Sequence, residues 1–187
     1  MKSINEYVQA AHSNAVSKGW WDPEPSFGEV ISLIHSEVSE ALEDFRNGKQ
    51  PTEVWYEADD GNHTVQWNDS RKPCGIPSEL ADIVIRVFDA CGRCGWGEAL
   101  EAWCSKAIPE PGCAVDEERS LAENLNIIHG NLTDCSRAES WQAFKFAIVV
   151  QNVEKLAGFY DIDLEQAIRE KMAYNATRPQ RHGGKKL

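Results

Sequence analysis

The sequence predicts an all-α fold with a small inserted β-hairpin, on three observations. Apolar residues recur every three or four positions through most of the chain, as in helices that bury one face. Several of these runs begin at a Ser or Asp suited to capping a helix. Strand-like composition is confined to residues 50–77. A chain of 187 residues, 42% of them hydrophobic, is normal for one compact domain, so we expect a single domain over 1–187.

The first two helices have the clearest start signals. Ser3 is a candidate N-cap with Glu6 three positions later, which is the pattern of a capping box, and this helix is expected to end near Ser17. Ser26 and Glu29 repeat the pattern, and the second helix is expected to run to Asn47-Gly48.

The next segment interrupts the helical pattern. Runs at 53–58 and 63–67 flank a Gly/Asn turn and predict a hairpin, followed by a loop with several Pro and Gly residues. A third helix is expected to begin with Ser78 as its N-cap, directly after Pro77. Its apolar residues between 80 and 88 point in nearly every direction around the axis, so this helix should be central.

The remaining pattern predicts four more helices. A short one is expected around 97–103, and longer ones at about 116–129 and 140–157. Asp163 is a candidate N-cap for the last helix, over 164–177, which Arg178-Pro179 should end.

Composition argues against several classes of partner. The formal net charge is -11, so nucleic acids and anionic membranes would on average be repelled, and no stretch approaches the ~18 apolar residues of a membrane span. No apolar signal-peptide region is visible near Met1, so we expect a cytoplasmic protein with reduced thiols. Cys91 and Cys94 have zinc-like spacing but no matching second pair, which favours ordinary thiols over a zinc site.

Two pairs of carboxylates stand three residues apart within apolar runs, Glu37 with Glu40 and Glu79 with Asp82. Side chains at this spacing share one face of a helix, so each pair can point at one spot. Carboxylates are hard ligands suited to Mg²⁺ or Mn²⁺, and four of them fit a two-metal site. The alternatives are a solvated helix edge and, for Asp82, an ion pair with Arg86 in the same helix.

The last helix carries Lys171, Asn175 and Arg178 on one side. These groups suit phosphate oxygens, although a basic helix C-terminus also complements the helix dipole, and the pattern alone favours neither reading.

The acidic pairs and the C-terminal run resemble the motifs of a known enzyme family. Glu37-x-x-Glu40 followed by Glu79-x-x-Asp82 resembles the motifs of the MazG-like all-α nucleoside triphosphate pyrophosphohydrolases, and Lys171-Met-Ala-Tyr-Asn-Ala-Thr-Arg-Pro179 is similar to the ending of short family members. The resemblance covers the first three helices and the last one.

The resemblance implies hydrolysis of a (d)NTP to (d)NMP and pyrophosphate, by a metal-activated water that attacks the α-phosphorus. Mg²⁺, with Mn²⁺ as a substitute, would be held by the four carboxylates, and the phosphates by Lys171, Asn175 and Arg178. The base would lie near Trp20 and His12. A homodimer or homotetramer is also implied, and some relatives, the MazZ type, prefer dGTP.

The chain departs from the family at three places. Many members have Glu where this chain has Ser36, a role that Asp44 could take over. Residues 50–77 and about 94–161 read as insertions, the second adding helices to the fold or to an oligomer interface.

Two other functions stay open from the sequence. A non-catalytic helical interaction protein would pair its carboxylates with Arg86, Arg46 or a partner chain. A nucleotide-sugar or dinucleotide pyrophosphatase would use the same metals on a different leaving group.

Overall fold

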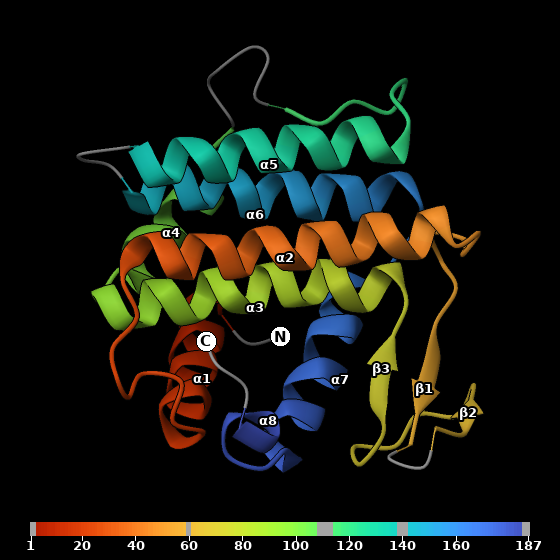
Figure 1. The fold of residues 1–187 in the computed structure, drawn as a ribbon. Coiled ribbons are helices and arrows are strands. Elements are labelled where there is room, and N and C mark those ends of the chain that lie inside the picture. Colours follow the sequence, from red (N-terminus) through yellow and green to blue (C-terminus); the bar gives the residue numbers. More distant parts are fainter. Residues whose placement is uncertain (1–2, 59–60, 108–113, 138–141, 185–187) are drawn as a thin grey trace.

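The protein is mostly helical, with one small sheet, as the sequence predicts. The computed structural model describes residues 3–58, 61–107, 114–137 and 142–184. Its centre is formed by four long helices: α2 (Phe27–Arg46), α3 (Ile76–Cys94), α5 (Leu121–Arg137) and α6 (Gln142–Phe159). Contacts join α2 to α3, α3 to α6, α6 to α5 and α5 to α2, so these helices close into a bundle (Figure 1).

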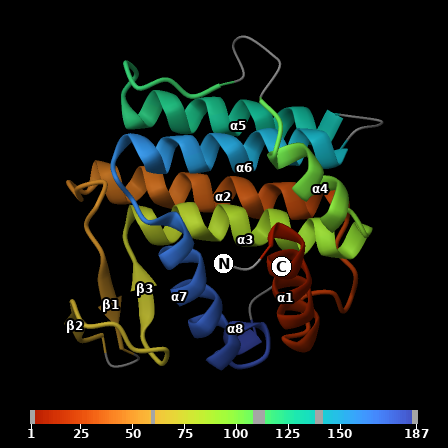
Figure 2. The ribbon, with the colours of Figure 1, turned by 180° about the vertical axis from the view of Figure 1, so that it is seen from behind.

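The other helices pack around this bundle. α1 (Ile4–Ser17) and α7 (Leu164–Thr177) both pack on α3, and α4 (Gly97–Cys104) lies between α1 and α6 (Figure 2). The short α8 (Arg181–Gly184) follows α7. Because α3 contacts α1, α2, α6 and α7, it is central, which confirms the expectation drawn from its apolar pattern. No helix in the described ranges has the length and apolar content needed to cross a membrane.

Local capping signals predict the starts of α1, α2 and α7 correctly. Both predicted capping boxes are formed, by Ser3 with Glu6 and by Ser26 with Glu29. The Asp163 side chain accepts a hydrogen bond from the Gln166 amide at the start of α7. The predicted short helix around 97–103 is confirmed as α4.

The segment between α2 and α3 forms a three-stranded antiparallel sheet rather than a two-stranded hairpin and a loop. β1 (Trp55–Glu57) lies between β2 (His63–Thr64) and β3 (Lys72–Cys74). The prediction was wrong for β3 because Pro73 argues against a strand. β3 is at the sheet edge, where a residue without an amide hydrogen is tolerated. Asp59 and Asp60 of the expected turn lie outside the described residues.

α3 begins three residues earlier than predicted, and Ser78 is not its N-cap. Gly75 occupies that position with φ 103°, and the helix starts at Ile76. The Ser78 hydroxyl is buried in the first turn and donates to the Pro73 carbonyl at 2.7 Å. A Cβ at Gly75 would lie 2.2 Å from the Glu53 carbonyl oxygen, so the close approach of β1's lead-in segment requires glycine here.

The predicted position of α5 was wrong by several residues. The expected helix at about 116–129 lies at Leu121–Arg137, and Ser120 and Glu123 hydrogen-bond to each other at its start. The Ser120 hydroxyl accepts from the Glu123 amide, and the Glu123 carboxylate accepts from the Ser120 amide. α6 covers nearly all of its expected range, of which 140–141 lie outside the described residues. Together with α4, these helices occupy the range at about 94–161 in which a helical insertion was predicted, and α5 and α6 supply half of the central bundle.

Candidate functional site

The two carboxylate pairs meet where α2 packs against α3. Glu37, Glu40 and Glu79 each offer an oxygen, and these oxygens all lie within 4.8 Å of one another. Glu37 and Glu79 are buried, each with 5% of its surface exposed, whereas Glu40 is exposed. The fold therefore brings three of the four predicted carboxylates together in one group. The fourth, Asp82, lies beside this group and forms an ion pair with Lys171.

Asp82 is paired with Lys171 from α7. The Lys171 ammonium lies 2.8 Å from Asp82 Oδ2 and 3.9 Å from Glu79 Oε1. It also donates to Ser78 Oγ at 2.8 Å and to the Pro73 carbonyl at 3.3 Å. With 2% of its surface exposed, Lys171 is buried among these partners. The predicted phosphate-binding lysine thus contacts the carboxylates directly.

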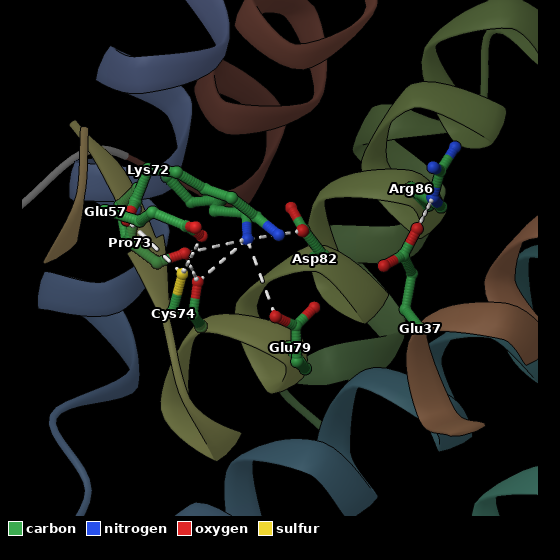
Figure 3. Close-up of polar contacts among 10 residues, drawn as sticks. Glu37, Glu57, Lys72, Pro73, Cys74, Glu79, Asp82 and Arg86 are labelled. Atoms are coloured by element: carbon green, nitrogen blue, oxygen red, sulfur yellow. Dashed lines mark hydrogen bonds and ion pairs between the residues drawn. The ribbon is translucent and has the colours of Figure 1, made fainter. Parts of the chain in front are cut away.

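Arg86 neutralises the other side of the group (Figure 3). Its guanidinium forms a hydrogen-bonded ion pair with Glu37 across the two helices, and not the pair with Asp82 that the sequence allowed as an alternative. Arg46 is engaged elsewhere, 2.8 Å from Glu43. The carboxylates are therefore held between two fixed cations, Arg86 and Lys171.

These cations do not fully compensate the buried charge. Burial raises the pKa of Glu79 to about 8, against the opposing effect of Lys171 and with the help of Asp82. Burial also raises the pKa of Glu37, although Arg86 opposes this. For Lys171, burial lowers the pKa, but the neighbouring Asp82 and Glu79 outweigh it and leave the pKa above its ordinary value.

Among the described residues, two buried polar atoms of this region lack a hydrogen-bond partner. Within the described part of the chain, no hydrogen bond reaches Glu79 Oε2 or Asn175 Oδ1. Buried polar atoms are normally satisfied, so each one calls for a ligand or an ordered water. At Glu79 the atom belongs to the group of three carboxylates.

The donor set fits a hard divalent cation. Mg²⁺ binds oxygens at about 2.1 Å, so two of its ligands lie at most about 4.2 Å apart. Oxygens within 4.8 Å of one another reach this spacing by small side-chain movements. Glu37, Glu40 and Glu79 are thus the residues that could hold such an ion.

A cavity of about 430 Å³ contains the carboxylates together with basic and aromatic residues. Lys72 of β3 and Arg178 and Arg181 near the C-terminus line it, as does the predicted Asn175. Burial lowers the pKa of Arg178, whose guanidinium stacks over the Tyr174 ring at 5.4 Å. Arg181 donates to the carbonyls of Gly19 and Asp22, and so ties the C-terminal segment to the connector after α1.

The connector after α1 supplies the aromatic part of the wall. Trp20 and Trp21 both line the cavity, and Trp21 donates its ring N–H to Asp89 at 2.9 Å. His12 is not among the lining residues; it lies 2.7 Å from the same Asp89 oxygen, and its ring meets Trp21 edge-on. The structure therefore places Trp20 at the cavity and His12 behind Trp21.

Sequence reasoning missed several lining residues. Lys72, Trp21, Asp89 and Arg181 all line the cavity, and for all of them except Asp89 no spacing rule makes a connection to the carboxylates. Asp89 and Arg86 continue the polar stripe of α3, which was the one available signal. Ser36 also lines the cavity and donates to the Leu33 carbonyl of its own helix, whereas Asp44 is not a lining residue.

The two cysteines with zinc-like spacing lie away from this cavity. Cys91 is a buried and Cys94 an exposed free thiol.

Comparisons of the chain with models of known protein families, with curated proteins and with solved structures gave no match.

Proposed function

We propose that the protein is a Mg²⁺-dependent nucleoside triphosphate pyrophosphohydrolase, which converts a (d)NTP to the monophosphate and pyrophosphate. The observation that carries this proposal is the convergence of Glu37, Glu40 and Glu79 in a cavity that also contains basic and aromatic side chains. The resemblance of the acidic motifs and of the C-terminal Lys-Asn-Arg run to MazG-like enzymes supports the same reaction.

The carboxylates would hold the metal. Bound there, Mg²⁺ would neutralise phosphate charge and polarise the reacting phosphoryl group. Glu37, Glu40 and Glu79 supply hard oxygen ligands, and the unpartnered Glu79 Oε2 would gain the positive partner that its burial requires. Mn²⁺ is expected to substitute because it accepts the same ligands.

The basic residues would hold the polyphosphate. Arg178 and Arg181 can offer paired N–H donors to phosphate oxygens, and Lys72 adds a point charge from β3. Asn175 can contribute its amide from the same wall. Lys171 is engaged with Asp82, so its role in this proposal is to fix the carboxylates and not to grip the substrate.

The tryptophans would receive the base. An aromatic face stacks on any nucleobase, so Trp20 and Trp21 support nucleotide binding without selecting a base. The proposal includes a preference for dGTP as a property that the nucleotide screen would measure. Asp89 holds the Trp21 ring in place through its N–H.

The decisive experiment compares two glutamates of α2. Glu40→Gln should abolish Mg²⁺-dependent pyrophosphate release, because it removes a ligand. Glu43→Gln is the matched control, since Glu43 is exposed on the same helix and pairs with Arg46. Monophosphate and pyrophosphate are measured for all common NTPs and dNTPs, with circular dichroism to verify folding. Full turnover by a folded Glu40→Gln variant would refute the site assignment.

A non-catalytic helical interaction protein is the second candidate. Arg86 already pairs with Glu37 and Lys171 with Asp82, as expected if these charges only join helices. Calorimetry separates the candidates, because a scaffold should show no Mg²⁺-linked nucleotide binding. Including nucleotide sugars and dinucleotides in the activity screen tests the remaining enzymatic alternative.

A further inference from the structure

Lys171 pairs with the carboxylates that a second metal ion would have to use. Two-metal sites hold their ions about 3.5–4 Å apart, bridged by shared carboxylates. Here a second ion beside Glu79 would use Asp82 as its other ligand. The Lys171 ammonium lies 2.8 Å from Asp82 Oδ2 and 3.9 Å from Glu79 Oε1, so it already faces both carboxylates that such an ion would need.

The lysine is anchored there by the fold. Its remaining hydrogen bonds go to Ser78 Oγ and the Pro73 carbonyl, both at the junction of β3 and α3. It is buried, with 2% of its surface exposed. Moving a buried ammonium away from its partners leaves charges unpaired, so an incoming cation would meet strong resistance.

Charge points to the same conclusion. The site contains four carboxylates, on Glu37, Glu40, Glu79 and Asp82, and two cations, on Arg86 and Lys171. When a bound cation keeps these six groups ionised, they carry two net negative charges among themselves, which one divalent ion neutralises. Glu79 Oε2, buried and without a partner in the described part of the chain, marks the side of the group that this ion would fill.

We propose that this site binds one divalent cation, on Glu37, Glu40 and Glu79, and that Lys171 replaces a second one by neutralising Asp82 from within the fold. The inference rests on the proposed function, because it concerns the metal site of that function. It makes Lys171 a positioning residue and Asp82 an outer partner instead of a metal ligand.

The test is a titration of the full chain with Mn²⁺ in the absence of nucleotide, in which electron paramagnetic resonance measures free Mn²⁺. The wild-type protein should bind one Mn²⁺ per chain. Lys171→Met frees Asp82 and Glu79, so this variant should bind two. Arg169→Met is the matched control: it removes an exposed positive charge from the same helix and should leave one Mn²⁺ per chain. Two ions in the wild type, or none, would overturn the inference, as would a folded Lys171→Met variant that binds one.

A second pair of variants decides the question if Lys171→Met does not fold. Asp82→Asn should keep one Mn²⁺ per chain and weaken the affinity at most about 100-fold, which is the effect of losing an outer partner. Glu40→Gln should lose saturable binding over the same range. If Asp82→Asn loses binding as fully as Glu40→Gln, Asp82 is a ligand and the inference is wrong.

The two proposals fail in different ways. If the chain binds one Mn²⁺ but releases no pyrophosphate from any nucleotide, the one-ion site stands and the proposed reaction is refuted. If the chain releases pyrophosphate and binds two Mn²⁺, the proposed reaction stands and the role assigned to Lys171 is refuted.

Discussion

Replacing Tyr56 by Phe should measure how strongly the small sheet holds the helix that carries Lys171. The Tyr56 hydroxyl donates to Glu170 Oε2 at 2.7 Å, with 7% and 9% of the two residues exposed. This bond joins β1 to α7, one residue before Lys171. Burial, and then Glu170, raise the pKa of Tyr56, so the hydroxyl remains a proton donor at any ordinary pH.

The expected cost follows from the charge of the acceptor. Phe fills the same space without the oxygen, so little packing changes and a buried carboxylate oxygen loses its donor. Hydrogen bonds to charged groups contribute about 1.5–3 kcal/mol. At about 2–4 °C per kcal/mol for a chain of this size, the melting temperature should fall by about 3–12 °C.

Urea unfolding followed by circular dichroism measures this cost. Tyr160→Phe is the control, since no hydrogen bond of the Tyr160 hydroxyl occurs within the described part of the chain. A double-mutant cycle with Glu170→Ala should give a coupling energy of about 0.5–3 kcal/mol. A Tyr56→Phe variant as stable as the control, or a coupling near zero, would refute the reasoning.

Three further predictions concern other parts of the chain. Gly75→Ala should lower the free energy of unfolding by at least about 1–3 kcal/mol, because the new Cβ would stand at a positive φ and 2.2 Å from a backbone oxygen. Gly61→Ala also has a positive φ but open space around the Cβ, so it should cost less in the same urea assay. Brief alkylation at pH 8 with peptide mass spectrometry should label the exposed Cys94 before Cys104, whose pKa burial raises to about 12; equal rates would contradict this. Under the proposed function, Trp21→Ala should raise KM about 5- to 150-fold, because about 1–3 kcal/mol of base stacking is lost, and kcat should change little. Steady-state kinetics measure both constants, and an unchanged KM would contradict the role proposed for Trp21.

The helices could be predicted where the start signal was local and unambiguous. Ser3 with Glu6 and Ser26 with Glu29 form their capping boxes as predicted, because a capping box involves only residues three apart. α5 shows the limit of the same rule. Asp116 and Ser120 are both acceptable caps, and the sequence alone does not choose between them.

The third strand shows a different limit. Pro73 reads as a loop residue, and only its pairing opposite Tyr56 at a sheet edge makes a strand of it. That pairing joins residues on either side of a turn and a loop, so no short window of sequence contains it.

The assembly state stays a prediction. The resemblance implies a homodimer or homotetramer, and size-exclusion chromatography with light scattering measures it directly. α5 and α6 cover α2 and α3 within the chain, so the bundle itself does not require a partner to be closed.

By itself, the sequence determined that two carboxylate pairs would each share a helix face and that one of these helices would be central, because both follow from the helical period. Only the tertiary structure decided which cation meets which carboxylate. Lys171 on α7 meets Asp82 on α3, and Arg86 and Glu37 are 49 positions apart. Helical spacing relates residues three or four positions apart, so contacts across such separations depend on how α2, α3 and α7 pack together.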